Sequence, residues 1–174
     1  MSTRTSDSNV DSFNALEDSE ARKLLESCLA VERFVDEVVS ARPYGSVAEL
    51  VSNAQRVAST LSGAEVAAAL ARHPRIGERA GAGHDVEFSQ HEQSGVDQSD
   101  QVVVQALADG NAAYEAKFDR VFLIRAAGRS ADEILAELQR RLGNTEEAEF
   151  AEVVTQLTQI AVLRLEQSVQ SSTQ

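Results

Sequence analysis

Apolar residues recur every three or four positions along most of the chain, which is the spacing of helices that bury one face. This spacing predicts about eight helices, at residues 18–29, 31–41, 46–59, 62–71, 89–95, 99–118, 130–142 and 144–169. The regular alternation that is typical of strands does not occur in the sequence. One short apolar run, at 121–124, has no candidate partner strand, so we expect it to be a buried connector.

Capping boxes mark the starts of several of these helices. In a capping box, a Ser or Asn side chain caps the first turn, and a Glu three residues later reaches back to the backbone. The candidate boxes are Ser46–Glu49, Ser62–Glu65, Ser89–Glu92, Ser130–Glu133 and Asn144–Glu147. The two prolines, Pro43 and Pro74, both fall where the helical spacing breaks. Together these signals predict an all-α fold, a single-domain bundle of about eight helices.

The N-terminus and one long loop depart from this pattern. Residues 1–11 are polar and rich in Ser and Thr, so we expect a disordered leader followed by one helical domain over 12–170. Residues 75–88 contain several glycines and few apolar side chains, which predicts an irregular loop. No apolar run approaches the roughly 20 residues that a membrane-spanning helix needs, so no membrane association is expected.

Composition and charge narrow the class of protein. Hydrophobic residues make up 43% and charged residues 25% of the 174 positions, which is typical of a soluble globular protein. The formal net charge of −12 argues against a nucleic acid or an anionic membrane as partner. The same charge repels an anionic substrate, so a site for one would need a specific cation. The single cysteine, Cys28, excludes an internal disulfide and fits a cytoplasmic location.

His73 is the first candidate for chemistry. Because Pro74 disfavours the helical conformation at the residue before it, His73 should end the helix of 62–71 in extended backbone. The dipole of a helix C-terminus favours the protonated imidazole, which suits a proton donor. The alternative is a surface histidine at a helix end.

The segment Ser89-Gln90-His91-Glu92-Gln93 is the second candidate. It can be a plain capping box, in which Glu92 satisfies backbone N–H groups. It can also direct Glu92, Gln93 and the first-turn N–H groups of helix 89–95 into a pocket, because helix N-termini bind anionic or carbonyl oxygen atoms. The sequence leaves both possibilities open.

Arg164 is the third candidate, because it lies within the apolar arc of the last predicted helix. The arc is formed by Val153, Val154, Leu157, Ile160, Ala161 and Leu165. A buried guanidinium must be paired, since an isolated buried charge is too costly. Its partner can be one of the chain's acidic residues, or a carbonyl or carboxylate of a ligand, whose geometry a guanidinium matches.

Other polar residues offer weaker signals. Asn111 lies in the apolar stripe of 99–118, where a core hydrogen bond is its expected role. The three histidines, His73, His84 and His91, and the glutamates near them lack a recognised ligand spacing, so no metal site is predicted. Neither a nucleotide-binding loop nor a nucleophile elbow occurs.

Seven segments, in order along the chain, resemble the 2-oxo-4-hydroxy-4-carboxy-5-ureidoimidazoline (OHCU) decarboxylases. They are Phe13–Leu16, Arg42–Tyr44, His73–Glu78, His91–Gly95, Asn111–Phe118, Phe122–Ser130 and Leu163–Leu165. The hexapeptide His73–Glu78 is similar to the bacterial branch, and the set covers about residues 13–168. One departure is Cys28–Val31, where the family often has Cys-Cys-Gly-Ser, and we expect it to affect local packing rather than activity.

The resemblance implies an all-α enzyme, usually a homodimer, that converts the small molecule OHCU into (S)-allantoin and carbon dioxide without cofactor or metal. By matching motifs it implies that His73, Glu92, Gln93 and Arg164 are catalytic. It also implies a set of substrate-binding residues: Pro74, Ser89, Gln90, His91, Phe122, Leu123, Ile124, Arg125 and Ala126. Two other functions stay open from the sequence: a hydrolase of a related ureido or hydantoin ring, and a non-enzymatic acidic helical binding module.

Overall fold

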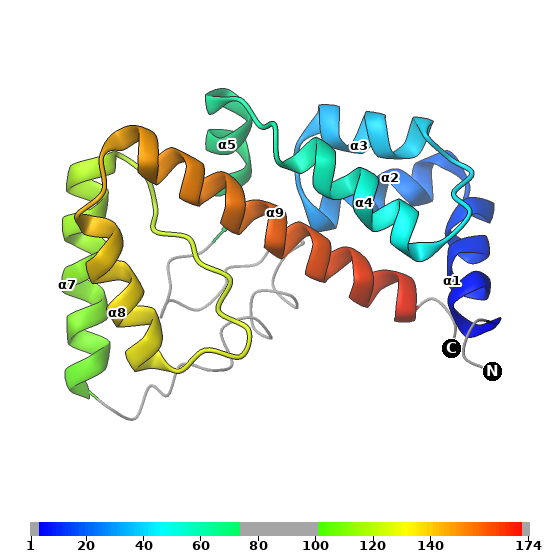
Figure 1. Cartoon of the computed structure of the whole chain (residues 1–174). Coiled ribbons are helices and arrows are strands. Elements are labelled where there is room, and N and C mark those ends of the chain that lie inside the picture. The colour runs from blue at the N-terminus through cyan, green and yellow to red at the C-terminus, as the bar shows by residue number, and fades with distance from the viewer. Residues whose placement is uncertain (1–3, 74–100, 172–174) are drawn as a thin grey trace. The chain divides into compact units, whose positions relative to one another are not determined.

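The computed structural model describes residues 4–73 and 101–171, and for residues 4–7 it describes the backbone alone (Figure 1). The helices are α1 (Arg4–Ala15), α2 (Asp18–Cys28), α3 (Glu32–Ser40), α4 (Val47–Ala58), α5 (Gly63–Leu70), α7 (Gln101–Phe118), α8 (Ala131–Leu142) and α9 (Glu146–Ser171). No strand occurs within these described ranges. The predicted all-α fold is therefore confirmed, and most predicted helices agree with the observed bounds to within two residues. The predicted helix 89–95 lies outside the described residues.

The chain divides into two compact units. Met1–Glu65 and Leu157–Gln174 form one, here called the N-terminal unit, and Val66–Gln156 form the other, here called the middle unit. Helices α5 and α9 each contribute residues to both units. The prediction of one domain over 12–170 is not tested by this division and stays a prediction.

Helices α1 to α4 build the N-terminal unit, in which α2 packs on α3, α3 on α4, and α1 on α4. Its core consists of apolar side chains at helical spacing, including Leu25, Phe34, Val38, Leu50 and Val57. The segment that departs from the family pattern adds Cys28, Leu29 and Val31 to the buried set.

Helix α1 overlaps the segment 1–11, for which the disordered leader stays a prediction. The helix runs from Arg4 to Ala15. Val10 and Phe13 are only 1% and 2% exposed, and they lie one turn apart on the same face. The burial of these two side chains stabilises the helix, although the composition of the segment is polar.

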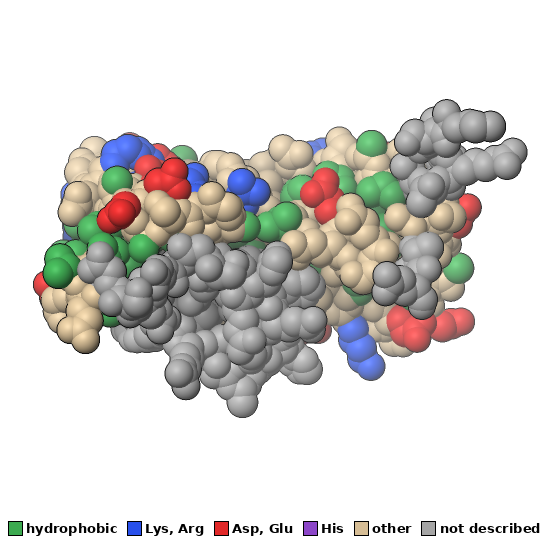
Figure 2. Space-filling model, turned by 90° about the horizontal axis from the view of Figure 1, so that it is seen from below, with side chains coloured by type: hydrophobic (Ala, Val, Ile, Leu, Met, Phe, Trp, Pro, Cys, Tyr) green, Lys and Arg blue, Asp and Glu red, His purple; other side chains and the backbone are tan. Residues whose placement is uncertain are grey.

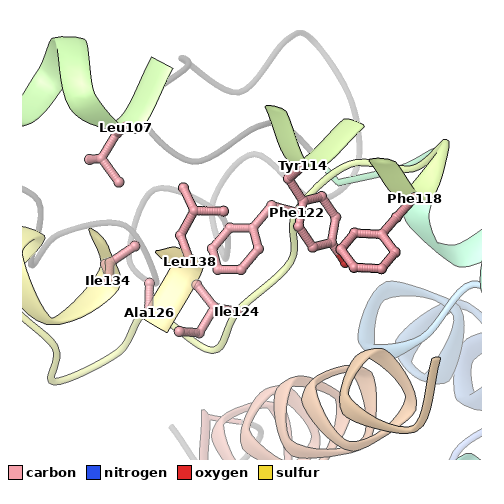
Figure 3. Close-up of a cluster of buried hydrophobic side chains, with 8 residues drawn as sticks. All are labelled: Leu107, Tyr114, Phe118, Phe122, Ile124, Ala126, Ile134 and Leu138. Carbon is pink, nitrogen blue, oxygen red and sulfur yellow. The ribbon is translucent and has the colours of Figure 1, made fainter. Parts of the chain in front are cut away.

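Helices α7 and α8 lie side by side in the middle unit (Figure 1). Their approach is close at Gly110, where an added Cβ atom would lie 2.5 Å from Cδ2 of Leu138. Residues of the segment between the two helices fill the space beside them. The resulting cluster contains Leu107, Tyr114, Phe118, Phe122, Ile124, Ala126, Ile134 and Leu138 (Figure 3). The apolar run at 121–124 is thus a buried connector, as predicted.

The capping predictions can be checked at four helix starts. Ser46 and Ser130 accept hydrogen bonds from Glu49 and Glu133 as predicted, and Ser130 and Glu133 complete a capping box. The prediction was wrong at Asn144, because α9 begins later and Thr145 accepts from the backbone N–H of Ala148. The side chain of Asn144 donates instead to Glu149 at 2.9 Å.

At the fourth helix start, that of α5, Ser62 and Glu65 form the predicted capping box. Glu65 also binds Arg33 on α3. Its carboxylate accepts from the backbone N–H of Ser62 and from Nε and Nη2 of Arg33, at 2.8, 2.8 and 3.1 Å. These bonds, above all those from Arg33, hold the pKa of Glu65 at about 2, against an ordinary value of 4.5.

We expect Glu65→Gln to lower the melting temperature at neutral pH, and we expect the difference from wild type to disappear in acid. A lowered pKa in the folded state stabilises the fold above the unfolded pKa, and this stabilisation is lost as the pH falls through the folded value. Melting curves should therefore show a constant difference above about pH 4.5 that shrinks as the pH approaches 2. A difference that stays constant from pH 7 down to 3 would contradict this account.

Candidate functional site

His73 lies just beyond the end of α5, as the sequence predicted. Its backbone N–H donates to the carbonyl of Leu70 at 3.0 Å, and Nδ1 of its half-buried ring lies 2.9 Å from the carbonyl oxygen of Ala69. Because a carbonyl oxygen only accepts, Nδ1 must carry the hydrogen in this contact. Any proton that the ring exchanges with a ligand therefore moves through Nε2.

Arg164 lies on the core side of α9, also as predicted, and is only 1% exposed. Its neighbours on the same arc, Ile160, Ala161 and Leu165, are buried as well. Nη1 of Arg164 donates to the backbone carbonyl of Ser27 on α2, at 3.3 Å. This contact fixes the guanidinium within the N-terminal unit, whereas His73 belongs to the middle unit.

The connector Phe122–Ala126 is the part of the candidate substrate-binding set that the structure describes most fully. Phe122, Leu123, Ile124 and Ala126 are each at most 4% exposed, and Arg125 is half-buried. Two hydrogen bonds hold its backbone. Nη1 of Arg141 donates to the carbonyl of Leu123 at 2.7 Å, and the N–H of Arg125 donates to Oε1 of Gln156 at 2.8 Å.

A buried ion pair underlies the first of these bonds. The side chains of Arg141 on α8 and Glu149 on α9 are both 0% exposed, and Nε of Arg141 lies 2.9 Å from Oε1 of Glu149. The hydroxyl of Tyr114 donates to the same carboxylate. The guanidinium carbon of Arg141 also lies 4.6 Å from the centroid of the Phe122 ring. Burial, together with the hydrogen bond to Glu149, raises the pKa of Tyr114 above its ordinary value.

Sequence reasoning missed Arg141, Glu149 and Gln156. A signal for them exists, because Arg141 continues the buried arc of Ile134 and Leu138 along α8. Glu149 and Gln156 likewise share a face of α9 with buried Val153. The same criterion that selected Arg164 would have selected these three residues.

Six predicted site residues belong to the segment 74–100. Pro74, Ser89, Gln90, His91, Glu92 and Gln93 lie outside the described residues. Their roles therefore stay predictions. Asn111, for which a core role was expected, is described and is 5% exposed.

The described residues contain neither a metal-binding cluster nor a membrane-spanning helix. Within residues 4–73 and 101–171, no group of three or more His, Cys, Asp or Glu side chains could hold a metal ion. None of the described helices is both long enough and apolar enough to cross a membrane. On the face shown in Figure 2, acidic and basic side chains of the described residues are interspersed rather than separated into patches.

Comparison with known proteins identifies the family. The family model described as OHCU decarboxylase matches residues 14–166, which is most of the chain. The chain belongs to the OHCU decarboxylase family. Of the three functions that the sequence left open, this membership supports the carboxy-lyase.

Two curated relatives of this OHCU decarboxylase family member are similar over 128 residues, or 72% of the chain. The 2-oxo-4-hydroxy-4-carboxy-5-ureidoimidazoline decarboxylase of Haloferax volcanii is 30% identical, with 74% of its length covered. The uric acid degradation bifunctional protein of Bacillus sp. (strain TB-90) is 27% identical. The chain spans only 25% of that protein's length.

Solved structures show the same fold. A crystal structure of an OHCU decarboxylase in the presence of (S)-allantoin matches with a TM-score of 0.68 at 23% identity, covering 87% of this chain and 97% of that one. A crystal structure of (S)-allantoin synthase matches with a TM-score of 0.64 at 16% identity, covering 91% of this chain and 53% of that one.

Proposed function

We propose that this protein removes the carboxylate of OHCU as carbon dioxide and forms (S)-allantoin, in the degradation of uric acid. The observation that carries the proposal is the family match over residues 14–166, which includes His73, the connector and Arg164. The names of both curated relatives point to the same chemistry, since one is an OHCU decarboxylase and the other acts in uric acid degradation.

The chemistry of the substrate defines what the protein has to supply. The carboxylate of OHCU is attached to a carbon next to a C=N bond, whose own carbon carries the ureido group. When the bond to the carboxylate breaks, its electron pair forms a C=C bond between the two ring carbons, and the C=N electrons move to the ring nitrogen, which takes up a proton. The enol that results loses its hydroxyl proton and becomes a carbonyl, while the ureido-bearing carbon gains a proton. Because the substrate has its own electron sink, the reaction requires no cofactor. The protein's tasks are orientation, a site that favours loss of the carboxylate, and delivery of a proton to one face.

His73 is the proposed proton donor. Its Nδ1–H is held by the carbonyl of Ala69, which fixes the ring plane and leaves Nε2 as the atom that transfers the proton. Its position beyond the last turn of α5 favours the charged imidazolium through the helix dipole. Donation to a single face of the ring would set the (S) configuration.

The other candidates have supporting roles in this proposal. Glu92 orients the imidazole or the substrate hydroxyl and crowds the departing carboxylate. Gln93 and the backbone of the connector bind the amide groups of the ring, with Pro74 against its face and the other residues of Ser89–Gln93 beside it. Arg164 binds a carbonyl or the carboxylate, and so offsets locally the repulsion expected from a chain of net charge −12.

We propose in addition that the protein is a homodimer and is located in the cytoplasm. The dimer is supported by the resemblance to the family alone. The location is supported by the single cysteine, Cys28, which is buried as a free thiol.

The identity of the product distinguishes the proposed decarboxylase from a hydrolase of a similar ring. OHCU can be generated in the cuvette from urate with uricase and hydroxyisourate hydrolase, and the product then analysed by mass spectrometry with and without the protein. We expect the protein to speed up formation of a product that has lost carbon dioxide. A product that retains the carboxylate and has gained water would contradict the proposal.

A further inference from the structure

We infer that Arg141, Glu149 and Gln156 are positioning residues, which hold the connector Phe122–Ala126 in the conformation that binds the substrate ring. The inference rests on the proposed function, because the connector contacts substrate only if the protein acts on OHCU. It concerns residues of the middle unit alone.

The connector has no regular secondary structure, so its own backbone does not determine its conformation. Two side chains from helices fix it on either side of Ile124. Arg141 on α8 binds the carbonyl of Leu123, and Gln156 on α9 binds the N–H of Arg125. Because a helix is a rigid support, anchors of this kind can hold a loop to the accuracy that ligand binding requires.

These anchors determine where the peptide groups of Ile124 point. In a trans peptide the C=O and the N–H point in opposite directions. The N–H of Ile124 shares a peptide with the anchored carbonyl of Leu123, so it points away from Arg141. The C=O of Ile124 shares a peptide with the anchored N–H of Arg125, so it points away from Gln156.

The backbone N–H of Ile124 is therefore a hydrogen-bond donor, and its C=O an acceptor, for a ligand. The residue is only 2% exposed, and among the described residues no hydrogen bond is made to its N–H or its C=O. Buried peptide groups are almost always paired, which indicates that a further partner completes them. A ring that carries amide N–H and C=O groups, as OHCU and allantoin do, matches this donor and acceptor.

Arg141 can serve as an anchor only because Glu149 neutralises it. A lone buried guanidinium is too costly, and the pair becomes acceptable when its remaining donors and acceptors are satisfied. Glu149 accepts from Nε and Nη2 of Arg141, at 2.9 and 2.5 Å, which leaves Nη1 for the carbonyl of Leu123. Tyr114 and Asn144 bind the same carboxylate and complete the network.

Steady-state kinetics of Gln156→Met test the inference, with Gln156→Glu as the conservative variant. We expect the KM for OHCU of Gln156→Met to rise about tenfold, with kcat within about threefold of wild type, because the connector binds the ring before and during the reaction. Gln156→Glu keeps an acceptor oxygen for the N–H of Arg125, so its KM should be close to that of wild type. Gln159→Met, at an exposed position of the same helix, is the matched control and should leave KM unchanged.

A second variant keeps the test decisive if Gln156→Met fails to fold. The double variant Arg141→Met/Glu149→Gln removes the anchor of Leu123 without leaving a buried charge. The amide oxygen introduced at position 149 can still accept the hydrogen bond from the hydroxyl of Tyr114. The double variant should show the same rise in KM. A KM equal to that of wild type in either folded variant would overturn the inference while leaving the proposed function intact. A wild-type protein that does not speed up OHCU decay would reject both.

Discussion

His73→Asn is expected to lower kcat for OHCU decarboxylation by about 10² to 10⁴, while the protein still folds and still binds (S)-allantoin. A positioned general acid typically contributes a factor of this size. Asparagine can keep a hydrogen bond to the carbonyl of Ala69 but has no proton to donate in the neutral pH range. Turnover in the coupled urate assay gives kcat.

The rise in melting temperature on adding (S)-allantoin is the control for this prediction. Ligand binding to the folded state raises the melting temperature, so an equal rise in wild type and variant shows that binding is retained. Turnover by His73→Asn close to that of wild type would reject the assignment of His73 as proton donor. Loss of the (S)-allantoin effect together with turnover would assign His73 to binding instead.

Glu149→Leu is expected to lower the free energy of unfolding by about 3–5 kcal/mol. The substitution leaves Arg141 as a fully buried charge without its partner, and breaking a buried pair in this way is strongly destabilising. It also leaves the hydroxyl of Tyr114 and the amide of Asn144 without the acceptor that they share. Denaturant unfolding, followed by circular dichroism, measures the change.

The neighbouring arginine offers a matched control. Arg140 is 49% exposed and pairs with both Glu137 and Glu152, at 2.6 Å in each case. Exposed ion pairs contribute only about 0–1 kcal/mol, so Glu152→Leu should cost little in comparison. If Glu149→Leu costs no more than Glu152→Leu, the buried network is not the stabilising feature that its geometry indicates.

The helices were predictable because their signals are local. Apolar spacing and capping residues such as Ser130 act within one or two turns, so the sequence alone contains them. The same holds for His73, because a proline next in the sequence predicts that the helix ends before it. It also holds for Arg164, whose burial follows from its position on the helix arc.

The parts that were not predicted depend on contacts between distant residues. Arg141 binds Leu123, which is 18 positions away, and Gln156 binds Arg125 across 31. Helix α1 forms where Val10 and Phe13 find a core, although its own composition is polar. The burial of Arg141 and Gln156 follows from their positions on the helix arcs, but the backbone groups that they bind are not evident from the local sequence. The core that covers Val10 and Phe13 is likewise not evident from the sequence around them.

The most direct test of the central claim is a time course of OHCU decay followed by circular dichroism. OHCU is produced from urate by uricase and hydroxyisourate hydrolase, and the signal is recorded with and without the protein. The account predicts that the protein accelerates the decay and that a single enantiomer, (S)-allantoin, accumulates. Decay at the spontaneous rate, or a racemic product, would contradict it.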